Sequence, residues 1–309
     1  MKKLFIGEVI RKRRIELGLK QYELCEGICE PVTMSRLETG KQTPSYNKLK
    51  TILQRLGLPD DQCYMLLSKN EMLISDLQTE ITSCNVLKDP ERGLPKIEEL
   101  EKIVEPDDTL TRQFILRSKV LLGKRENGKI VSYTFDKKLE MLFEAIRLTA
   151  PNFDIDAIYE GLYSIDEIKV INQIAHVYSD FGENKKAIDI YYQLLKYIKK
   201  HFQNILQSSG VLPLVAFNYA RELVLIDHYA EAVEIAETGW QACVQYGQYY
   251  TLPATIALIA ECYHFLEEDD KSKNFYRQAY YLCQAINDKG CLNTVVSEIQ
   301  KYFGNDFSF

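Results

Sequence analysis

Apolar residues recur at spacings of three and four along almost the whole chain, and few stretches alternate as strands do. This spacing gathers apolar side chains on one face of a helix, so we expect an all-α fold. Gly and Pro interrupt the pattern so as to leave short helices before residue 57 and longer, paired helices after about residue 110. A chain of 309 residues is too long for one small domain, and its 46% hydrophobic content is enough for more than one packed core, so we expect two domains.

Positive charge is concentrated at the beginning of the chain. Residues 1–57 contain 12 Lys or Arg against 6 Asp or Glu, whereas the whole chain has a formal net charge of -6. A basic segment on an acidic remainder favours a partner such as DNA at one end only. Charges also interrupt the first residues where a signal peptide needs an apolar run, and no apolar stretch is long enough to span a membrane. We expect a cytoplasmic protein without membrane association.

A helix-turn-helix pattern is predicted within the basic segment. A second short helix over residues 21–26 is followed by Gly27, which suits a turn, and a third helix covers residues 31–38. Pro31 fits the first turn of that helix, and Gly40 can end it with a positive φ. We interpret the third helix as the candidate DNA-recognition helix.

The third helix is predicted to have an inner and an outer face. Met34 and Leu37 are three residues apart and should face the core, which leaves Val32, Thr33 and Arg36 outside. An Arg can form two hydrogen bonds with guanine in the major groove, and a Thr offers a hydroxyl and a methyl to base edges. The candidate DNA-binding residues are Arg14, Lys20, Gln21, Glu30, Pro31, Val32, Thr33, Arg36, Lys41, Thr43 and Tyr46.

The stretch IRKRRIELGLKQYELCEGICEPVTMSRLETGKQTPSYNKLKTILQRLGL resembles the Xre/Cro family of helix-turn-helix domains across all of its helices. The resemblance implies a five-helix DNA-binding domain over residues 1–60 and an ion pair between Arg14 and Glu38 that bridges the first and third helices. One departure is Glu30-Pro31, where many relatives have Ser-Gln. The missing Gln removes a base-reading amide, so the operator sequence cannot be copied from relatives.

Three later segments resemble one another, and they read VINQIAHVYSDFGENKKAIDIYYQLLKYI, AFNYARELVLIDHYAEAVEIAETGW and IALIAECYHFLEEDDKSKNFYRQAYYL. Each places a small residue at the same position, Ala175, Ala220 and Ala260, where two helices of a hairpin must approach closely. Such repetition predicts tetratricopeptide-like helical hairpins stacked into a right-handed superhelix. A weaker unit is expected near residues 139–151 and a capping helix over residues 289–303.

The inner face of stacked hairpins is the predicted ligand site. The first helix of each hairpin lines a concave groove that suits an extended peptide. Asn side chains can pair with a peptide backbone, and Arg221 can bind a carboxylate, although each such residue could also lie on a solvated helix face. The candidate peptide-binding residues are Asn172, Gln173, His176, Asn218, Arg221, Glu261 and His264.

A helix-turn-helix domain followed by tetratricopeptide hairpins resembles the Rgg, PlcR and PrgX group of peptide-sensing regulators over nearly the whole chain. The resemblance implies a homodimer that binds a palindromic operator in double-stranded DNA and is controlled by a short signalling peptide. We expect a DNA-binding domain at 1–60, a linker helix and connecting region at 61–108, and a sensing and dimerising domain at 109–309.

Two other function classes remain open at this stage. In the first, the protein is a constitutive repressor whose repeats dock a partner protein. In the second, an enzyme is joined to a DNA-binding head; this would require a nucleophile, a base or metal ligands that come together, and the sequence offers no such set. The eight cysteines include no CxxC pair, and Cys25 and Cys29, four apart, have no second ligand pair nearby for zinc. We therefore expect free thiols, no metal, no cofactor and no catalysis.

Overall fold

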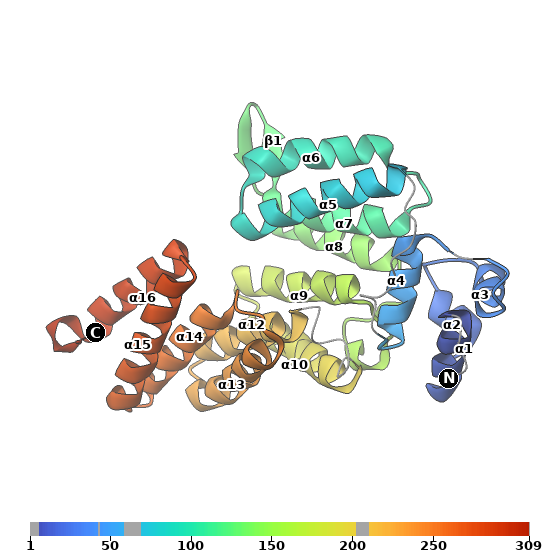
Figure 1. Ribbon diagram of the computed structural model, residues 1–309. Coiled ribbons are helices and arrows are strands. Elements are labelled where there is room, and N and C mark those ends of the chain that lie inside the picture. The colour runs from blue at the N-terminus through green and yellow to red at the C-terminus, as the bar shows by residue number, and fades with distance from the viewer. Residues whose placement is uncertain (1–5, 43, 59–68, 202–209, 309) are drawn as a thin grey trace. The chain divides into compact units, whose positions relative to one another are not determined.

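The computed structural model describes residues 6–42, 44–58, 69–201 and 210–308 (Figure 1). The chain divides into two compact units, Met1–Val177 and Tyr178–Phe309. The described segments are helical apart from one short β-hairpin, which confirms the all-α expectation.

The basic segment folds as helices around a small core. These helices are α1 (Ile6–Glu16), α2 (Gln21–Cys25), α3 (Pro31–Glu38) and α4 (Tyr46–Arg55). The predicted second and third helices are confirmed, with Gly27 and Gly40 both at positive φ where the chain turns. Met34 and Leu37 are buried in the core, as their spacing predicts. The resemblance implies five helices over residues 1–60; the described residues of this segment form four, and residues 1–5, 43, 59 and 60 lie outside the described segments.

Four further helices of the first unit pack side by side: α5 (Lys69–Leu87), α6 (Pro90–Ile103), α7 (Thr109–Leu122) and α8 (Phe135–Arg147). Helix α6 lies within the expected connecting region at 61–108. The Asp89 carboxylate accepts a hydrogen bond from the Arg92 backbone and caps this helix, and Leu94 and Ile97 bury its inner face. Gly93 permits the close approach to α7, because a Cβ there would lie 2.3 Å from a Leu122 methyl carbon.

A β-hairpin that the helical spacing did not predict joins α7 to α8. Its strands, β1 (Lys124–Glu126) and β2 (Lys129–Val131), pair antiparallel. Asn127 and Gly128 between them both have positive φ, as a two-residue type I′ turn requires. The Asn-Gly pair was therefore a local signal for this hairpin.

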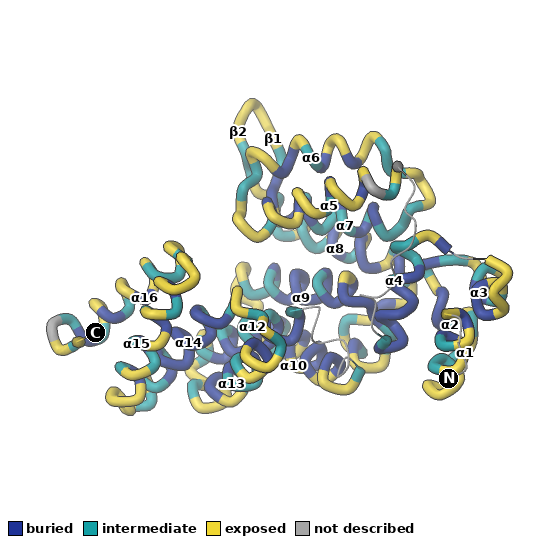
Figure 2. The backbone as a smooth tube through the Cα atoms, viewed as in Figure 1, coloured by how far each residue is buried: buried dark blue, intermediate teal, exposed yellow. Residues whose placement is uncertain are grey.

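Helix α9 (Ile165–Asp180) follows a short 3₁₀ turn, η1 (Ile158–Glu160). It is buried over most of its length (Figure 2). Because α9 begins beside α4 and carries three of the candidate peptide-binding residues further along, it is central to the candidate site described below.

The second unit is a succession of helices, each packed on the next (Figure 1). They are α10 (Asn184–His201), α12 (Val211–Leu225), α13 (Tyr229–Tyr246), α14 (Leu252–Phe265), α15 (Asp269–Ala285), α16 (Lys289–Tyr302) and the 3₁₀ turn η2 (Gly304–Asp306). Ala220 and Ala260 are fully buried at the predicted close contacts, and the Ser272 hydroxyl donates to the Ala260 carbonyl at 2.7 Å. The predicted hairpins α12–α13 and α14–α15 and the capping helix α16 are thus confirmed.

Candidate functional site

The outer face of α3 presents the residues predicted for base contacts. Val32 is 60% exposed, Arg36 is exposed and Thr33 is half-buried. Glu30 and Pro31, at the start of the helix, are also exposed. These side chains give α3 an exposed face with polar and apolar groups, and an α-helix is an element that the major groove of DNA admits.

A buried carboxylate holds α3 in place. Glu38 accepts from Arg14 Nε at 2.6 Å and Nη2 at 2.9 Å, and from Gln21 Nε2 at 2.7 Å. Burial acts to raise the pKa of Glu38, but the hydrogen bonds from Arg14 and Gln21 and the Arg14 charge bring it below its ordinary value. The implied Arg14–Glu38 pair is confirmed. Arg14 and Gln21, also candidates for DNA contact, therefore act within the structure by orienting α3.

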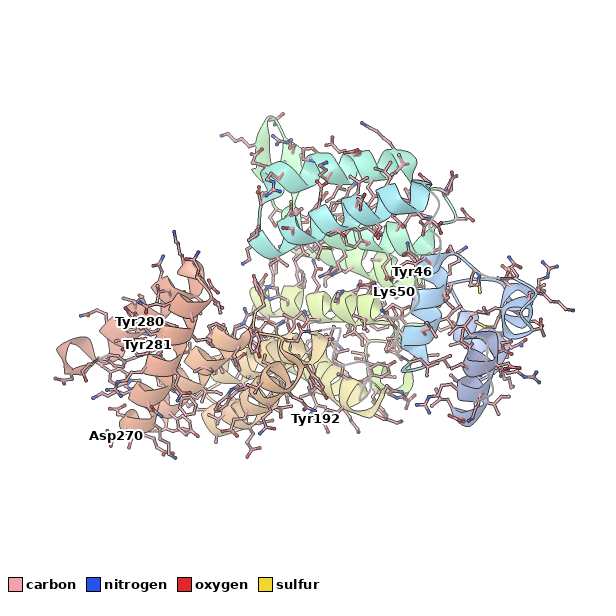
Figure 3. The ribbon with its side chains drawn as sticks, viewed as in Figure 1. Tyr46, Lys50, Tyr192, Asp270, Tyr280 and Tyr281 are labelled. Carbon is pink, nitrogen blue, oxygen red and sulfur yellow. The ribbon has the colours of Figure 1, made fainter. Side chains whose placement is uncertain are left out.

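The remaining candidates surround α3 and α4. Lys20 and Lys41 are exposed, whereas Tyr46 is half-buried. Tyr46 and Lys50 follow one another on consecutive turns of α4 (Figure 3), and the Lys50 charge contributes to lowering the pKa of Asp166 on α9, after the larger effect of Lys169. Thr43 lies outside the described residues.

The helices of the basic segment are joined to the rest of the first unit by one buried arginine. Arg55, the last residue of α4, donates to the carbonyl oxygens of Leu24 and Glu26 at 3.0 and 2.8 Å. Its second terminal nitrogen donates to the Thr149 carbonyl and to Glu167 Oε1, both at 2.8 Å. One guanidinium thus connects α2, the end of α8 and the first turn of α9.

The partner of this arginine is a fully buried carboxylate at the start of α9. Glu167 also accepts from the Ser164 backbone at 2.5 Å. Burial acts to raise the pKa of Glu167, but the charge and hydrogen bond of Arg55 bring it below its ordinary value. Next to it, the Gln54 side chain accepts from the Ile165 backbone at 3.1 Å. Consecutive residues of α4 therefore both bind the first turn of α9.

The turn between α2 and α3 completes this junction. Gly27 has a φ of +69°, and a Cβ placed there would lie 2.1 Å from the Thr149 carbonyl oxygen. The Gly27 carbonyl accepts from the Thr109 hydroxyl at 3.0 Å, and Asn152 donates to Glu26 at 2.7 Å. Sequence reasoning missed this junction, because Arg55 and Glu167 are 112 residues apart and neither belongs to a local motif.

Two of the three peptide candidates on α9 are buried within the first unit. Asn172 and Gln173 are 8% and 5% exposed, and His176 is half-buried. Gln173 donates to the Arg117 carbonyl at 3.4 Å, while its own side-chain oxygen has no hydrogen-bond partner among the described residues. A buried amide oxygen without a donor is costly, which makes Gln173 a position where a ligand N–H is favourable.

Helix α12 presents a second acceptor of this kind. Glu222 is fully buried; one of its oxygens accepts from Ser179 at 2.6 Å and lies 3.4 Å from the Arg221 guanidinium. The other oxygen has no partner among the described residues. The candidates Asn218 and Arg221 lie half-buried on the same helix. Sequence reasoning missed Glu222, since an acidic residue between apolar positions gives no sign of its burial.

The candidates on α14 are engaged with the capping helix. Glu261 accepts from the Tyr302 hydroxyl at 2.6 Å. His264 bonds Asp269 at 2.8 Å, and its ring lies 4.5 Å from that of Tyr302 and 5.2 Å from that of Phe303. In this structure, Glu261 and His264 therefore hold α16 against α14.

A titratable carboxyl group lies at the same contact. Burial, followed by repulsion from Glu261, raises the pKa of Glu298 on α16 from an ordinary value of 4.5 to about 7, against the opposing effects of Tyr276 and Lys301. The neutral carboxyl group is thus the form that the folded protein prefers.

We expect stability to fall as the pH rises from about 4.5 to about 7, because the folded state keeps a proton on Glu298 that the unfolded chain has released. The stabilisation is complete below the unfolded pKa and is lost as the pH passes the folded pKa. Glu298→Gln should remove this part of the pH dependence, whereas Glu234→Gln, at an exposed position of α13, should preserve it. Thermal unfolding from pH 5 to pH 8 measures the effect; equal pH dependence in Glu298→Gln and in the unmodified protein would contradict it.

The sequence matches known protein families over most of its length. A sequence model of the RNPP family C-terminal domain matches residues 78–303, and a helix-turn-helix model matches residues 10–62. The chain belongs to the RNPP family. No curated protein sequence matches it significantly. Within the described segments of this RNPP chain, no helix is long and apolar enough to cross a membrane, and no group of three His, Cys, Asp or Glu residues is arranged to hold a metal ion.

Solved structures share this fold at low sequence identity. PlcR of Bacillus thuringiensis, solved with the peptide PapR7 and DNA, is 20% identical, with 94% of this chain and 98% of that chain covered and a TM-score of 0.60. ComR of Streptococcus vestibularis, solved with its signalling peptide XIP, is 17% identical over 96% and 97%, with a TM-score of 0.51. A Rap protein complexed with competence and sporulation factor is 13% identical over 96% and 73%, with a TM-score of 0.53.

Proposed function

We propose that this RNPP-family protein is a sequence-specific transcriptional regulator whose repeat region binds a short signalling peptide and couples it to DNA binding. The observation that carries the proposal is the recognition helix α3, which Glu38, Arg14 and Gln21 fix from behind while Arg36 and Val32 remain exposed in front. Family membership and the peptide and DNA bound to PlcR support the same function. We propose no catalytic activity for the described residues, and we place the protein in the cytoplasm.

We propose that successive segments of the chain have different functions. Residues 1–60 bind DNA, 61–108 connect, and 109–309 sense the peptide and dimerise. Arg36 reads bases, while Lys20, Lys41, Thr43 and Tyr46 contact phosphates. Because one recognition helix reads only a few base pairs, a two-fold dimer on a palindromic operator supplies the remaining specificity.

For the peptide, we propose contacts on the first helices of the hairpins. On α9 these are Asn172, Gln173 and His176; on α12, Asn218 and Arg221; and on α14, Glu261 and His264. We add Glu222 to them. One side-chain oxygen each of Gln173 and Glu222 has no hydrogen-bond donor among the described residues, and backbone N–H or amino groups of a peptide would supply one.

Coupling to DNA binding has a physical route along α9. Its first turn holds the DNA-binding helices through Glu167 and Arg55, and Asn172 and Gln173 follow one to two turns later on the same helix. A ligand shifts an equilibrium only if it binds the two states differently. A peptide whose binding displaces α9 has a different affinity for the state in which Glu167 contacts Arg55 than for the state in which this contact is broken.

The experiment that tests the function is fluorescence anisotropy of the purified protein on labelled DNA from upstream of its own gene, with random DNA of equal length as the control. We expect tight, salt-sensitive binding that changes when a small-peptide fraction of spent host medium is added. Tight binding that ignores both that fraction and synthetic candidate peptides would favour a constitutive repressor with a protein-docking repeat domain. Equal binding of both DNAs, repeated on sites selected from a random library, would refute sequence-specific binding.

Arg36→Ala should lower the preference for operator over random DNA by about 1–3 kcal/mol, because it removes a donor pair that reads a base. Lys41→Ala is the matched comparison, since loss of a phosphate contact weakens binding to both DNAs alike and reduces the salt dependence. Competition anisotropy with the two DNAs measures both variants. Unchanged discrimination in Arg36→Ala would remove the base-reading role of that residue.

A further inference from the structure

A cavity of about 110 Å³ lies where the segment 150–163, after α8, meets α2 and the end of α4. Its inner wall is aromatic and apolar: Phe153 and Tyr163 are 8% and 3% exposed, with ring centroids 6.0 Å apart in an edge-to-face arrangement. The half-buried Leu162 also lines it. We call this space the junction cavity. Because a cavity of roughly 150 Å³ holds benzene in another protein, the junction cavity suits a small molecule of about that size.

The rim of the junction cavity is acidic. Glu23 on α2 and Glu26, which follows α2, both line it, and the exposed Glu26 accepts a hydrogen bond from the Asn152 side chain at 2.7 Å. Arg55 is the basic residue of the lining, and Glu167 balances its charge at 2.8 Å. The two rim carboxylates therefore have no balancing cation among the lining residues, which favours a positively charged ligand.

Arg55 adds an unused hydrogen-bond donor to the wall of this cavity. Its terminal nitrogens donate to four acceptors, the carbonyl oxygens of Leu24, Glu26 and Thr149 and the carboxylate of Glu167. The fifth N–H, on Nε, is buried and has no acceptor among the described residues. A buried donor of a charged group is costly to leave unsatisfied, so an oxygen of a ligand is favourable there.

We propose that the junction cavity binds a small organic cation that carries a primary ammonium group and a nearby neutral carbonyl oxygen. The ammonium group binds Glu23 and Glu26, and the carbonyl oxygen accepts from Arg55 Nε. A branched aliphatic body packs against Phe153 and Tyr163. An α-amino amide combines these three groups, whereas the carboxylate of a free amino acid is repelled by the two glutamates.

The position of the junction cavity gives such a ligand an effect on the whole first unit. The lining residues come from α2, the end of α4 and the segment 150–163, so the ligand contacts the DNA-binding helices and the rest of the unit at once. It binds the state in which these parts are together and therefore stabilises that state. None of the lining residues is a candidate for base or peptide contact, so the site does not depend on the proposed function.

The test is isothermal titration calorimetry of the full-length protein with leucinamide, which has the ammonium group, the carbonyl oxygen and a branched body. We expect a Kd of about 1 mM or tighter. Two related compounds each lack one group: 4-methylpentanamide has no amine, and 3-methylbutylamine has no amide. Each should bind about tenfold more weakly, because it loses a hydrogen bond with a charged protein group. No measurable binding of leucinamide, or equal binding of leucinamide and either compound, would overturn the proposal.

Variants of the protein locate the ligand. Glu23→Gln and Glu26→Gln remove a charge but keep an oxygen for the existing hydrogen bonds, and each should weaken leucinamide binding about tenfold. Glu16→Gln, at an exposed position outside the cavity, should leave binding unchanged. Full binding in both cavity variants would refute the site.

A tripeptide distinguishes the two sources of this chemistry. Leu-Gly-Gly carries the same ammonium and carbonyl groups at the start of a peptide, and it should bind more weakly than leucinamide, because the cavity is small. Tighter binding of the tripeptide would overturn the assignment to a small molecule. All of these measurements are made without DNA, so their failure is distinguishable from failure of the proposed function.

Discussion

Glu167→Gln is expected to destabilise the folded protein by about 3–5 kcal/mol, because it leaves Arg55 as a buried charge without its partner. The side chains of Arg55 and Glu167 are 2% and 0% exposed, so water cannot replace the lost carboxylate. The amide is nearly the same size as the carboxylate, and hence the change in free energy reports charge rather than packing. We also expect faster amide hydrogen exchange in α4 and in the first turn of α9, which lose their common contact.

The matched control is Glu16→Gln, which removes the same charge from an exposed pair. Arg13 and Glu16 lie 3.3 Å apart with side chains 35% and 47% exposed, and such pairs contribute about 0–1 kcal/mol. Urea unfolding followed by circular dichroism measures both variants; the single tryptophan, Trp240, lies in the second unit and does not report this junction. Equal stability of the two variants would show that the buried pair does not hold the DNA-binding helices.

Gly27→Ala is expected to cost about 2–4 kcal/mol, because it combines an unfavourable positive φ with overpacking. The new methyl group would lie 2.1 Å from the Thr149 carbonyl oxygen, and a backbone atom cannot rotate away as a side chain can. Either the turn or the end of α8 must move. We therefore expect weaker operator binding together with the loss of stability.

Gly18→Ala isolates the backbone part of this effect. Gly18 has a φ of +71°, nearly that of Gly27, but nothing lies within 4 Å of the added Cβ. Its cost should be about 1 kcal/mol, that of the positive φ alone. The difference in unfolding free energy between the two variants measures the contact with Thr149. If both variants lose the same stability, the turn does not pack against residue 149.

Short-range patterns predicted the elements whose signals lie within one or two turns of the chain. Pro31, Gly40 and the spacing of Met34 and Leu37 were enough for α3, and the repeated small residues were enough for the α12–α13 and α14–α15 hairpins. No such pattern predicted α6, which lies within the expected connecting region at 61–108. Its helix depends on the Asp89 cap and on burial of Leu94 and Ile97 by α5 and α7, and burial is a property of neighbours.

In the candidate site, too, the sequence predicted some roles, while others depend on tertiary contacts. Sequence alone placed Arg36 and Val32 on the outside of the recognition helix and, through family resemblance, paired Arg14 with Glu38. It could not show that Gln21 joins that pair, nor that Glu222 is buried. Those roles depend on which side chains meet after folding, and side-chain identity at one position carries no information about a partner far along the chain.

By itself, then, the sequence determined the helical class, the helix-turn-helix and its exposed recognition face, and the repeated hairpins, because helix periodicity, caps and turns are local properties. Only the tertiary structure decided how the DNA-binding helices are held. Arg55 at the end of α4 contacts Glu167 at the start of α9, 112 residues away, and Gly27 contacts Thr149, because folding brings these segments together and excludes the water that would otherwise weaken their interactions.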